Sequence, residues 1–171
     1  MKLIFKILPI VTLSLLFESC NKDDDPIITG SLVGTWEMID LHVDDGINET
    51  TFMGQMITSH FTISGSDYHS TITFTENPNM VSTDGNYTAI TDIDLLGSDT
   101  TTVYTWETGT WSLIGEMLTQ IVQGDTSNIE ILELSDSKLR IKQNLEEMYS
   151  DTSFGFTVHE TATVFSSFEK Q

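Results

Sequence analysis

Cysteine is almost absent from this chain of 171 residues, which contains a single one, Cys20. One thiol forms no internal disulfide, so the folded part must depend on its hydrophobic core for stability. A lone cysteine also leaves none of the paired cysteine spacings that are typical of structural zinc sites. The fold is therefore expected to hold together without covalent cross-links.

Basic side chains are also scarce, with seven Lys and Arg against 26 Asp and Glu and a formal net charge of −19 at pH 7. Nucleic acids are bound by clustered Lys and Arg, so the composition excludes a nucleic-acid partner. Docking on anionic lipid head groups by charge is disfavoured for the same reason. The acidity mainly favours solubility.

Long apolar runs are missing except near the beginning of the chain. Residues 3–17 are almost entirely apolar and follow the positive Lys2. A transmembrane helix needs about 20 apolar residues, so this stretch is too short to be one. Its length and its basic start instead fit the core of a cleavable secretory signal.

Cys20 comes directly after this leader, an arrangement that resembles a bacterial lipoprotein signal. The acidic segment behind it resembles the export tag of surface lipoproteins in the Bacteroidetes and consists of Lys22, Asp23, Asp24 and Asp25. The resemblance implies a signal peptide over 1–19 and fatty acyl chains such as palmitate on Cys20. The protein would then be anchored in the outer membrane at the cell surface, or otherwise face the periplasm. The alternative is a buried structural cysteine followed by an ordinary acidic linker.

The rest of the chain divides into a flexible acidic tether over 20–31 and one domain over 32–171. The domain is rich in Thr, Ile, Val and aromatic residues between Gly, Asn, Asp and Ser, which is typical of strands and turns. The spacing of the turns predicts a meander, sandwich or barrel. We expect a turn at residues 84–86, one long strand over 100–113, and ambiguous structure over 52–62 and 145–150. The remaining expected strands cover 33–43, 68–74, 79–83, 87–93, 117–122, 128–134, 138–144 and 155–168.

Two segments of the domain resemble each other: GTWEMI begins at Gly34, and GTWSLI begins at Gly109. The first looks like the G-x-W signature of lipocalins, and the wider pattern resembles bacterial lipocalin-like lipoproteins. The resemblance implies an all-β, antiparallel, up-and-down β-barrel of about eight strands. Gly34, Trp36 and Trp111 would then pack at the end of the barrel.

One feature of typical lipocalins is an arginine from late in the chain that packs over this tryptophan. The only arginine here, Arg140, precedes the last expected strand, and Lys170 is the only basic residue after Lys142. The broader lipocalin-like group is therefore a better match than the true lipocalins.

No arrangement of residues predicts catalysis, a cofactor or a metal. The four histidines, His42, His60, His69 and His159, lack the close spacing of a metal site. Asp40 and His42 share one face of a strand, so they form an acid–base or metal candidate that still needs a third partner. We expect no enzyme.

The resemblance favours a binding function, with a small, mostly apolar ligand inside the barrel. The methionines are numerous and could line an adaptable pocket, although ordinary core packing is the simpler explanation. The alternative is a structural or interaction module that binds an envelope protein or a glycan through its outer face or loops.

Overall fold

The computed structural model describes residues 26–94, 96–151, 153 and 155–171. The predicted signal peptide, the predicted acylation site Cys20 and the predicted export tag over residues 22–25 lie outside the described residues. The described chain is built from strands, which are β1 Ile27–Ile28, β2 Gly34–Phe52, β3 Gln55–Thr75, β4 Met80–Ile93, β5 Gly97–Tyr104, β6 Thr108–Ile114, β7 Met117–Val122, β8 Asp125–Leu134, β9 Lys138–Asp151 and β10 Phe156–Lys170.

Eight of these strands form a ring in the order β8-β7-β6-β4-β3-β2-β10-β9, and the pairing of β9 with β8 closes it. Every pair in the ring is antiparallel. The predicted antiparallel barrel of about eight strands is thus confirmed. β5 lies outside the ring and pairs only with β4. β1 lies in the segment expected to be a tether, and it forms a short parallel pairing with β8.

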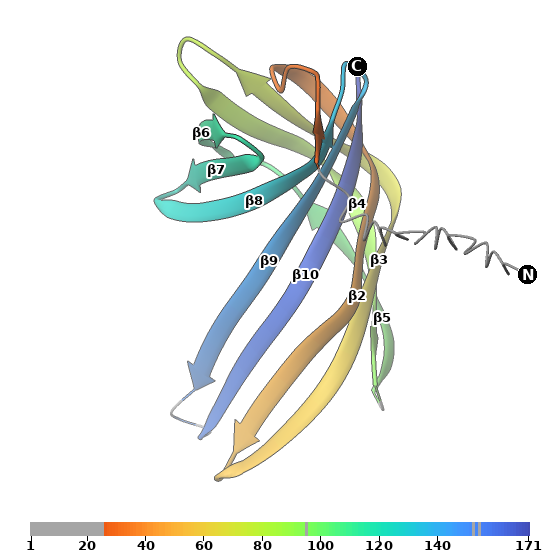
Figure 1. Ribbon diagram of the computed structural model, residues 1–171. Helices are drawn as coiled ribbons and strands as arrows, with labels where there is room; N and C mark the ends of the chain where they lie inside the picture. Colours follow the sequence, from red (N-terminus) through yellow and green to blue (C-terminus); the bar gives the residue numbers. More distant parts are fainter. Residues whose placement is uncertain (1–25, 95, 152, 154) are drawn as a thin grey trace, which may run out of the picture.

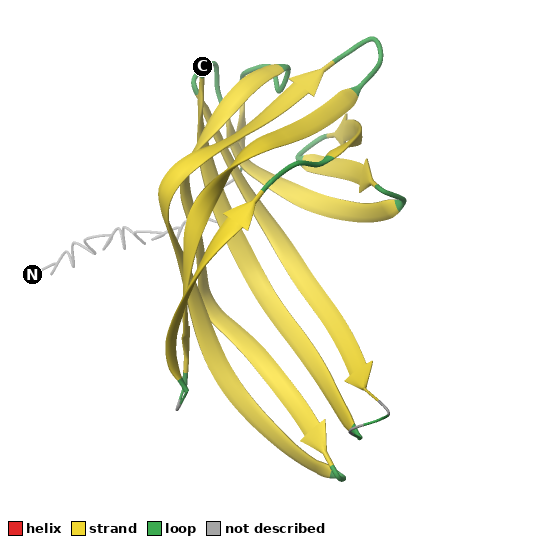
Figure 2. Cartoon of the chain, turned by 180° about the vertical axis from the view of Figure 1, so that it is seen from behind, coloured by secondary structure: helices red, strands yellow, loops and turns green. Residues whose placement is uncertain are grey.

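The ring is closed at one end and opens at the other. β4 pairs with β6 only over 80–82, and β8 pairs with β9 only between residues 130 and 142. Beyond these pairings β2, β3, β9 and β10 run on together, away from the short strands β6 to β8 (Figure 1). The view from behind shows the same separation (Figure 2). We call the part around β6 to β8 the closed end, and the part toward the β2–β3 and β9–β10 turns the flared end.

The hydrophobic core fills the closed end. Alternate residues of β3, namely Ser70, Ile72 and Phe74, are buried there, because successive side chains of a strand point to opposite faces. The complete buried cluster is Leu32, Trp36, Met38, Leu41, Ile72, Phe74, Val81, Leu118, Ile129, Ile131, Leu134, Leu139 and Phe168.

The turn predicted at residues 84–86 is wrong, because β4 runs through this segment without a break. Gly85 has a φ of +103°, and a Cβ there would collide with the carbonyl oxygen of His69 on β3. The glycine is required by this close approach of two strands rather than by a chain reversal.

The single strand predicted over 100–113 is also wrong. The chain leaves the sheet at residues 105–107, between β5 and β6. There the Thr105 N–H donates to the carbonyl of Gly85, and the Glu107 N–H donates to the hydroxyl of Thr83. β4 therefore pairs with β6 before Gly85 and with β5 after it, so β5 and β6 are two separate strands. The segments left ambiguous are largely strand, since β3 begins at residue 55 and β9 continues to residue 151.

Candidate functional site

A cavity of about 610 Å³ opens on the inner face of the flared end. Its apolar wall comes from β3 and β4, where Phe61 pairs with Ile93 and Ile63 pairs with Thr91. The full lining is Asn48, Thr50, Ile57, Thr58, Ser59, Phe61, Ile63, Thr91, Ile93, Asp94, Leu96 and Glu160. This volume lies within the range of sites that hold small molecules, which are mostly apolar with a few polar groups.

The cavity is continuous with the barrel interior. Ile63 packs against the buried core cluster, whereas Ile57 is 63% exposed and Leu96 is 80% exposed. The apolar lining therefore leads from the solvent inward to the core. Exposed apolar side chains in a concave surface are a typical sign of a binding site.

Gly46 shapes the wall beside Phe61. The two residues are paired across β2 and β3, and a Cβ on residue 46 would collide with the Phe61 ring. The glycine thus lets the aromatic ring lie directly on the backbone of β2. A larger residue at position 46 would displace this ring.

A polar network lies on the β2 and β10 side of the cavity. The Asn48 amide Nδ2 donates to Glu160 Oε1 at 2.6 Å, and the Thr50 hydroxyl donates to Asn48 Oδ1 at 2.9 Å. All three residues line the cavity. Glu160 is directly opposite Glu147 in the pairing of β10 with β9. The polar part of the cavity is thus acidic.

Two tyrosines pack against the core cluster. Tyr68 and Tyr87 have their ring centroids 6.4 Å apart. The Leu41 N–H donates to the Tyr68 hydroxyl at 3.0 Å. Burial raises the pKa of both phenols above its ordinary value, so both are neutral hydrogen-bonding groups near neutral pH.

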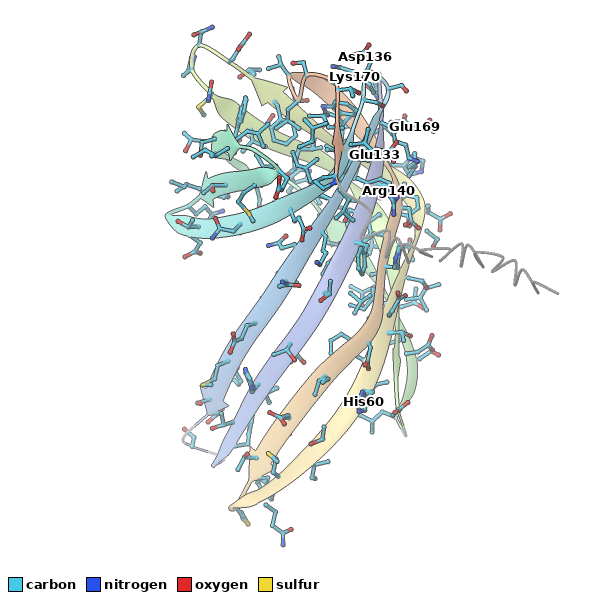
Figure 3. All side chains as sticks on the ribbon, viewed as in Figure 1. His60, Glu133, Asp136, Arg140, Glu169 and Lys170 are labelled. Carbon is cyan, nitrogen blue, oxygen red and sulfur yellow. The ribbon has the colours of Figure 1, made fainter. Side chains whose placement is uncertain are left out.

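The G-x-W segment lies at the closed end. Trp36 is fully buried, and its ring N–H donates to the carbonyl of Leu32 at 2.8 Å. Lys170 Nζ lies 4.8 Å from the centroid of the Trp36 ring and donates to the carbonyl of Ser31 at 3.2 Å. Lys170 thus takes the place of the arginine of typical lipocalins, as a cation over the ring. Figure 3 labels Lys170 at this end of the molecule.

Gly34 makes this contact possible. Its φ is +138°, and a Cβ on it would be 2.7 Å from Lys170 Cε. Trp111 lies on β6 and packs against the core cluster, with its ring N–H donating to the carbonyl of Thr75 at 2.8 Å. Its ring meets Phe74 edge-on at 5.8 Å. None of Gly34, Trp36 and Trp111 lines the cavity.

The methionines do not line the cavity, so the idea of a methionine-rich pocket is wrong. Met38 belongs to the buried core. Met53, Met56 and Met148 are between 65% and 81% exposed and lie toward the flared end. Alternation along each strand, rather than residue type, decides which side chains face inward.

Three of the histidines, His42, His60 and His159, face carboxylates rather than one another. His42 Nδ1 is 2.8 Å from Asp40, and its ring stacks on Phe165 with centroids 5.2 Å apart. His60, labelled in Figure 3, pairs with Asp45 at 2.8 Å, and this hydrogen bond together with the charge of Asp45 raises the pKa of His60.

His159 connects three strands, because its two ring nitrogens face Glu146 at 3.1 Å and Glu49 at 3.4 Å. Hydrogen bonds to Glu146 and then to Glu49 raise the pKa of His159 above 6.5. Within the described part of the chain, no group of three or more His, Cys, Asp or Glu residues is arranged to hold a metal ion. Asp40 and His42 therefore gain no third partner there.

The sequence interpretation missed the cavity residues. Ile57, Phe61 and Ile63 alternate along β3, but they fall mostly in the segment left ambiguous. Their period of two was the signal that could have shown an inward-facing strand. Asn48 and Glu160 are 112 positions apart, and no local pattern joins them.

The sequence profile of the lipocalin-like domain matches residues 32–141, more than half of the chain. This chain belongs to the lipocalin-like domain family. The match includes β2 to β8, so it covers the G-x-W segment and the β2, β3 and β4 walls of the cavity. No curated protein matches the sequence.

Among solved structures, the chain is similar to a polyisoprenoid-binding domain from Saccharophagus degradans implicated in plant cell wall breakdown. The two are 12% identical, with a TM-score of 0.33, and the alignment covers 77% of this chain and 98% of that domain. A TM-score this low does not support a common fold, so the barrel fold follows from the strand pairing and the family match alone. The described residues contain no helix of the length and apolarity needed to cross a bilayer.

Proposed function

We propose that this lipocalin-like barrel binds a small, mostly apolar ligand in the cavity of its flared end. The observation that carries the proposal is the cavity itself, about 610 Å³ in volume and walled by Ile57, Phe61, Ile63, Ile93 and Leu96. Apolar surface that is removed from water by a ligand contributes about 25 cal/mol per Å² before the cost of association is subtracted. The proposed activity is binding without a catalytic step.

Two matched tryptophan substitutions test the site. Ser59 lines the cavity, whereas Ser64 lies on the same strand, is exposed and does not line the cavity. Ser59→Trp fills the cavity, and Ser64→Trp adds the same ring to the outer face. The neutral fluorescent probe N-phenyl-1-naphthylamine should bind the wild type and Ser64→Trp with similar affinity. It should bind Ser59→Trp at least about tenfold more weakly, which corresponds to a loss of ~1.4 kcal/mol of binding free energy. Equal binding to all three proteins, or to none, would overturn the proposal.

We also propose that lipid on Cys20 anchors the protein in the outer membrane, on the cell surface. The support is the position of Cys20 between an apolar leader and the acidic segment over residues 22–25. A net charge of −19 leaves little attraction to anionic head groups, so the lipid would supply the membrane affinity.

The anchoring proposal has a separate test. Cys20→Ala should release the protein from the membrane fraction and abolish incorporation of labelled palmitate. Protease treatment of whole cells, which should degrade the wild type, then tests surface exposure. A Cys20→Ala variant that stays in the membrane fraction would contradict lipid anchoring.

A second candidate function is glycan binding on the outer face, and one observation favours it. Tyr104 and Trp106 are 61% and 71% exposed, with ring centroids 5.4 Å apart. Exposed aromatic pairs provide flat apolar surfaces for a partner. Envelope glycans should quench the fluorescence of Trp106 if this surface binds them, and Trp106→Phe should remove that change. An unchanged spectrum would leave the cavity as the better candidate.

A further inference from the structure

The charged side chains at the cavity are all acidic. Glu160 and Asp94 line it, and Glu147 is directly opposite Glu160 on β9. Neither Lys, Arg nor His is present in the lining. A ligand that occupies the cavity therefore places its polar part beside carboxylates.

The lysines and the arginine of the described residues are all engaged elsewhere. Lys138 and Arg140 face Glu133, Lys142 faces Glu130, and Lys170 lies over Trp36. Figure 3 labels Arg140 and Lys170 at the closed end, far along the strands from the flared end. Among the described residues, no Lys or Arg lies where it would neutralise an anionic ligand in the cavity.

The geometry of Glu160 suits it for contact with a ligand. The Asn48 amide holds Glu160 Oε1 at 2.6 Å, and the Thr50 hydroxyl fixes the orientation of that amide from the other side. No hydrogen bond engages the second carboxylate oxygen, Oε2, in the described structure, and the side chain is exposed at the cavity. A positioned carboxylate with a free oxygen is an acceptor for a cationic donor.

We propose that the ligand is a cationic amphiphile, with an apolar tail against Phe61, Ile63 and Ile93 and an ammonium head at Glu160. This inference rests on the proposed function and adds the chemical class of the ligand. Glu160 determines specificity by attracting an ammonium group, and together with Asp94 it disfavours a carboxylate. The tail supplies most of the affinity, because an exposed ion pair alone contributes little.

Three ligands with the same tail test the head-group preference. Dodecylamine, dodecanol and dodecanoate compete with N-phenyl-1-naphthylamine for the full chain carrying Cys20→Ala at pH 7 and low salt. Each compound is kept below its solubility limit and, for the two charged compounds, below the micellar concentration. We expect the amine to bind about fivefold more tightly than the alcohol, as an exposed charge pair allows, and the carboxylate to bind more weakly than the alcohol. The preference for the amine should decline as salt is added.

Glu160→Gln keeps the shape of the side chain and an oxygen that accepts from Asn48. It should reduce the preference for amine over alcohol to about twofold or less, chiefly by weakening the binding of the amine. Asp94→Asn is a second variant with the same expected direction and a smaller effect. Glu169→Gln removes an exposed charge at the closed end and should leave the preference intact.

Equal affinities for amine and alcohol in the wild type would overturn the inference while leaving the proposed function standing. An unchanged preference in Glu160→Gln would overturn the role of Glu160. Failure of the probe and all three dodecyl compounds to bind would instead overturn the proposed function, and the inference with it.

Discussion

The contact between Gly34 and Lys170 gives a quantitative prediction for the closed end. Gly34 has a φ of +138°, a region that L-residues rarely adopt, and a Cβ there would be 2.7 Å from Lys170 Cε. Gly34→Ala therefore adds backbone strain and also pushes the lysine away from the Trp36 ring. Lys170→Ala removes the lysine alone.

The two effects have different sizes. Backbone strain at such a position costs about 1–3 kcal/mol. Loss of a partly exposed cation such as Lys170 from an aromatic face costs about 0.5–1 kcal/mol. In the double variant Gly34→Ala/Lys170→Ala the lysine contact is lost only once. The double variant should thus be more stable than the sum of the single effects predicts, by about 0.5–1 kcal/mol.

Urea unfolding followed by tryptophan fluorescence measures all four free energies of the cycle. Glu169→Ala is the matched control. Glu169 is exposed and precedes Lys170 in β10, and because consecutive side chains of a strand point to opposite faces, its side chain points away from that of Lys170. Gly34→Ala combined with Glu169→Ala should be additive. Additivity in the lysine cycle as well would refute the reasoning, because it would mean that residue 34 and Lys170 do not share a contact.

Three further predictions concern other parts of the barrel. Gly85→Ala should lower the free energy of unfolding by at least about 2 kcal/mol, measured in urea, because its Cβ would meet the backbone of His69 at a φ of +103°. His159 has a raised pKa in the folded state, so its contribution to stability is complete below pH 6.5 and is lost as the pH rises through the folded pKa. The free energy of unfolding, measured at pH 5.5 and pH 8.5, should accordingly be lower for His159→Gln than for the wild type mainly at pH 5.5. A difference between the two proteins that does not depend on pH would contradict this. Trp36→Phe should cost more than Trp111→Phe in thermal unfolding, because only Trp36 is fully buried and its loss leaves a buried carbonyl without a donor.

Much of the architecture could be predicted from the sequence because its signals are local. Thr, Ile and Val alternating between Gly, Asn and Asp indicate strands, and the G-x-W segment at Gly34 indicates the family. These signals gave an all-β barrel, which the strand pairing confirms. The cation over Trp36 is not such a local signal, because Lys170 comes from the end of β10 and meets Trp36 only in the folded barrel.

One of the errors arose where a glycine serves a tertiary contact. Asp84-Gly85-Asn86 has the composition of a turn, yet Gly85 lies inside β4, where β3 approaches too closely for a side chain. No local pattern distinguishes these two uses of glycine. The cavity was missed for a related reason, since Phe61 on β3 and Glu160 on β10 become neighbours of one site only after the sheet has formed.

The most direct test of the central claim is the location of the ligand, measured by NMR of isoleucine δ1 methyl groups during a titration with dodecylamine. Ile57, Ile63 and Ile93 line the cavity, whereas Ile72, Ile129 and Ile131 belong to the closed-end core. We expect saturable shifts for the cavity methyls and unchanged positions for the core methyls. Shifts confined to other methyls, or none at concentrations that saturate the fluorescence signal, would contradict a ligand site in the flared end.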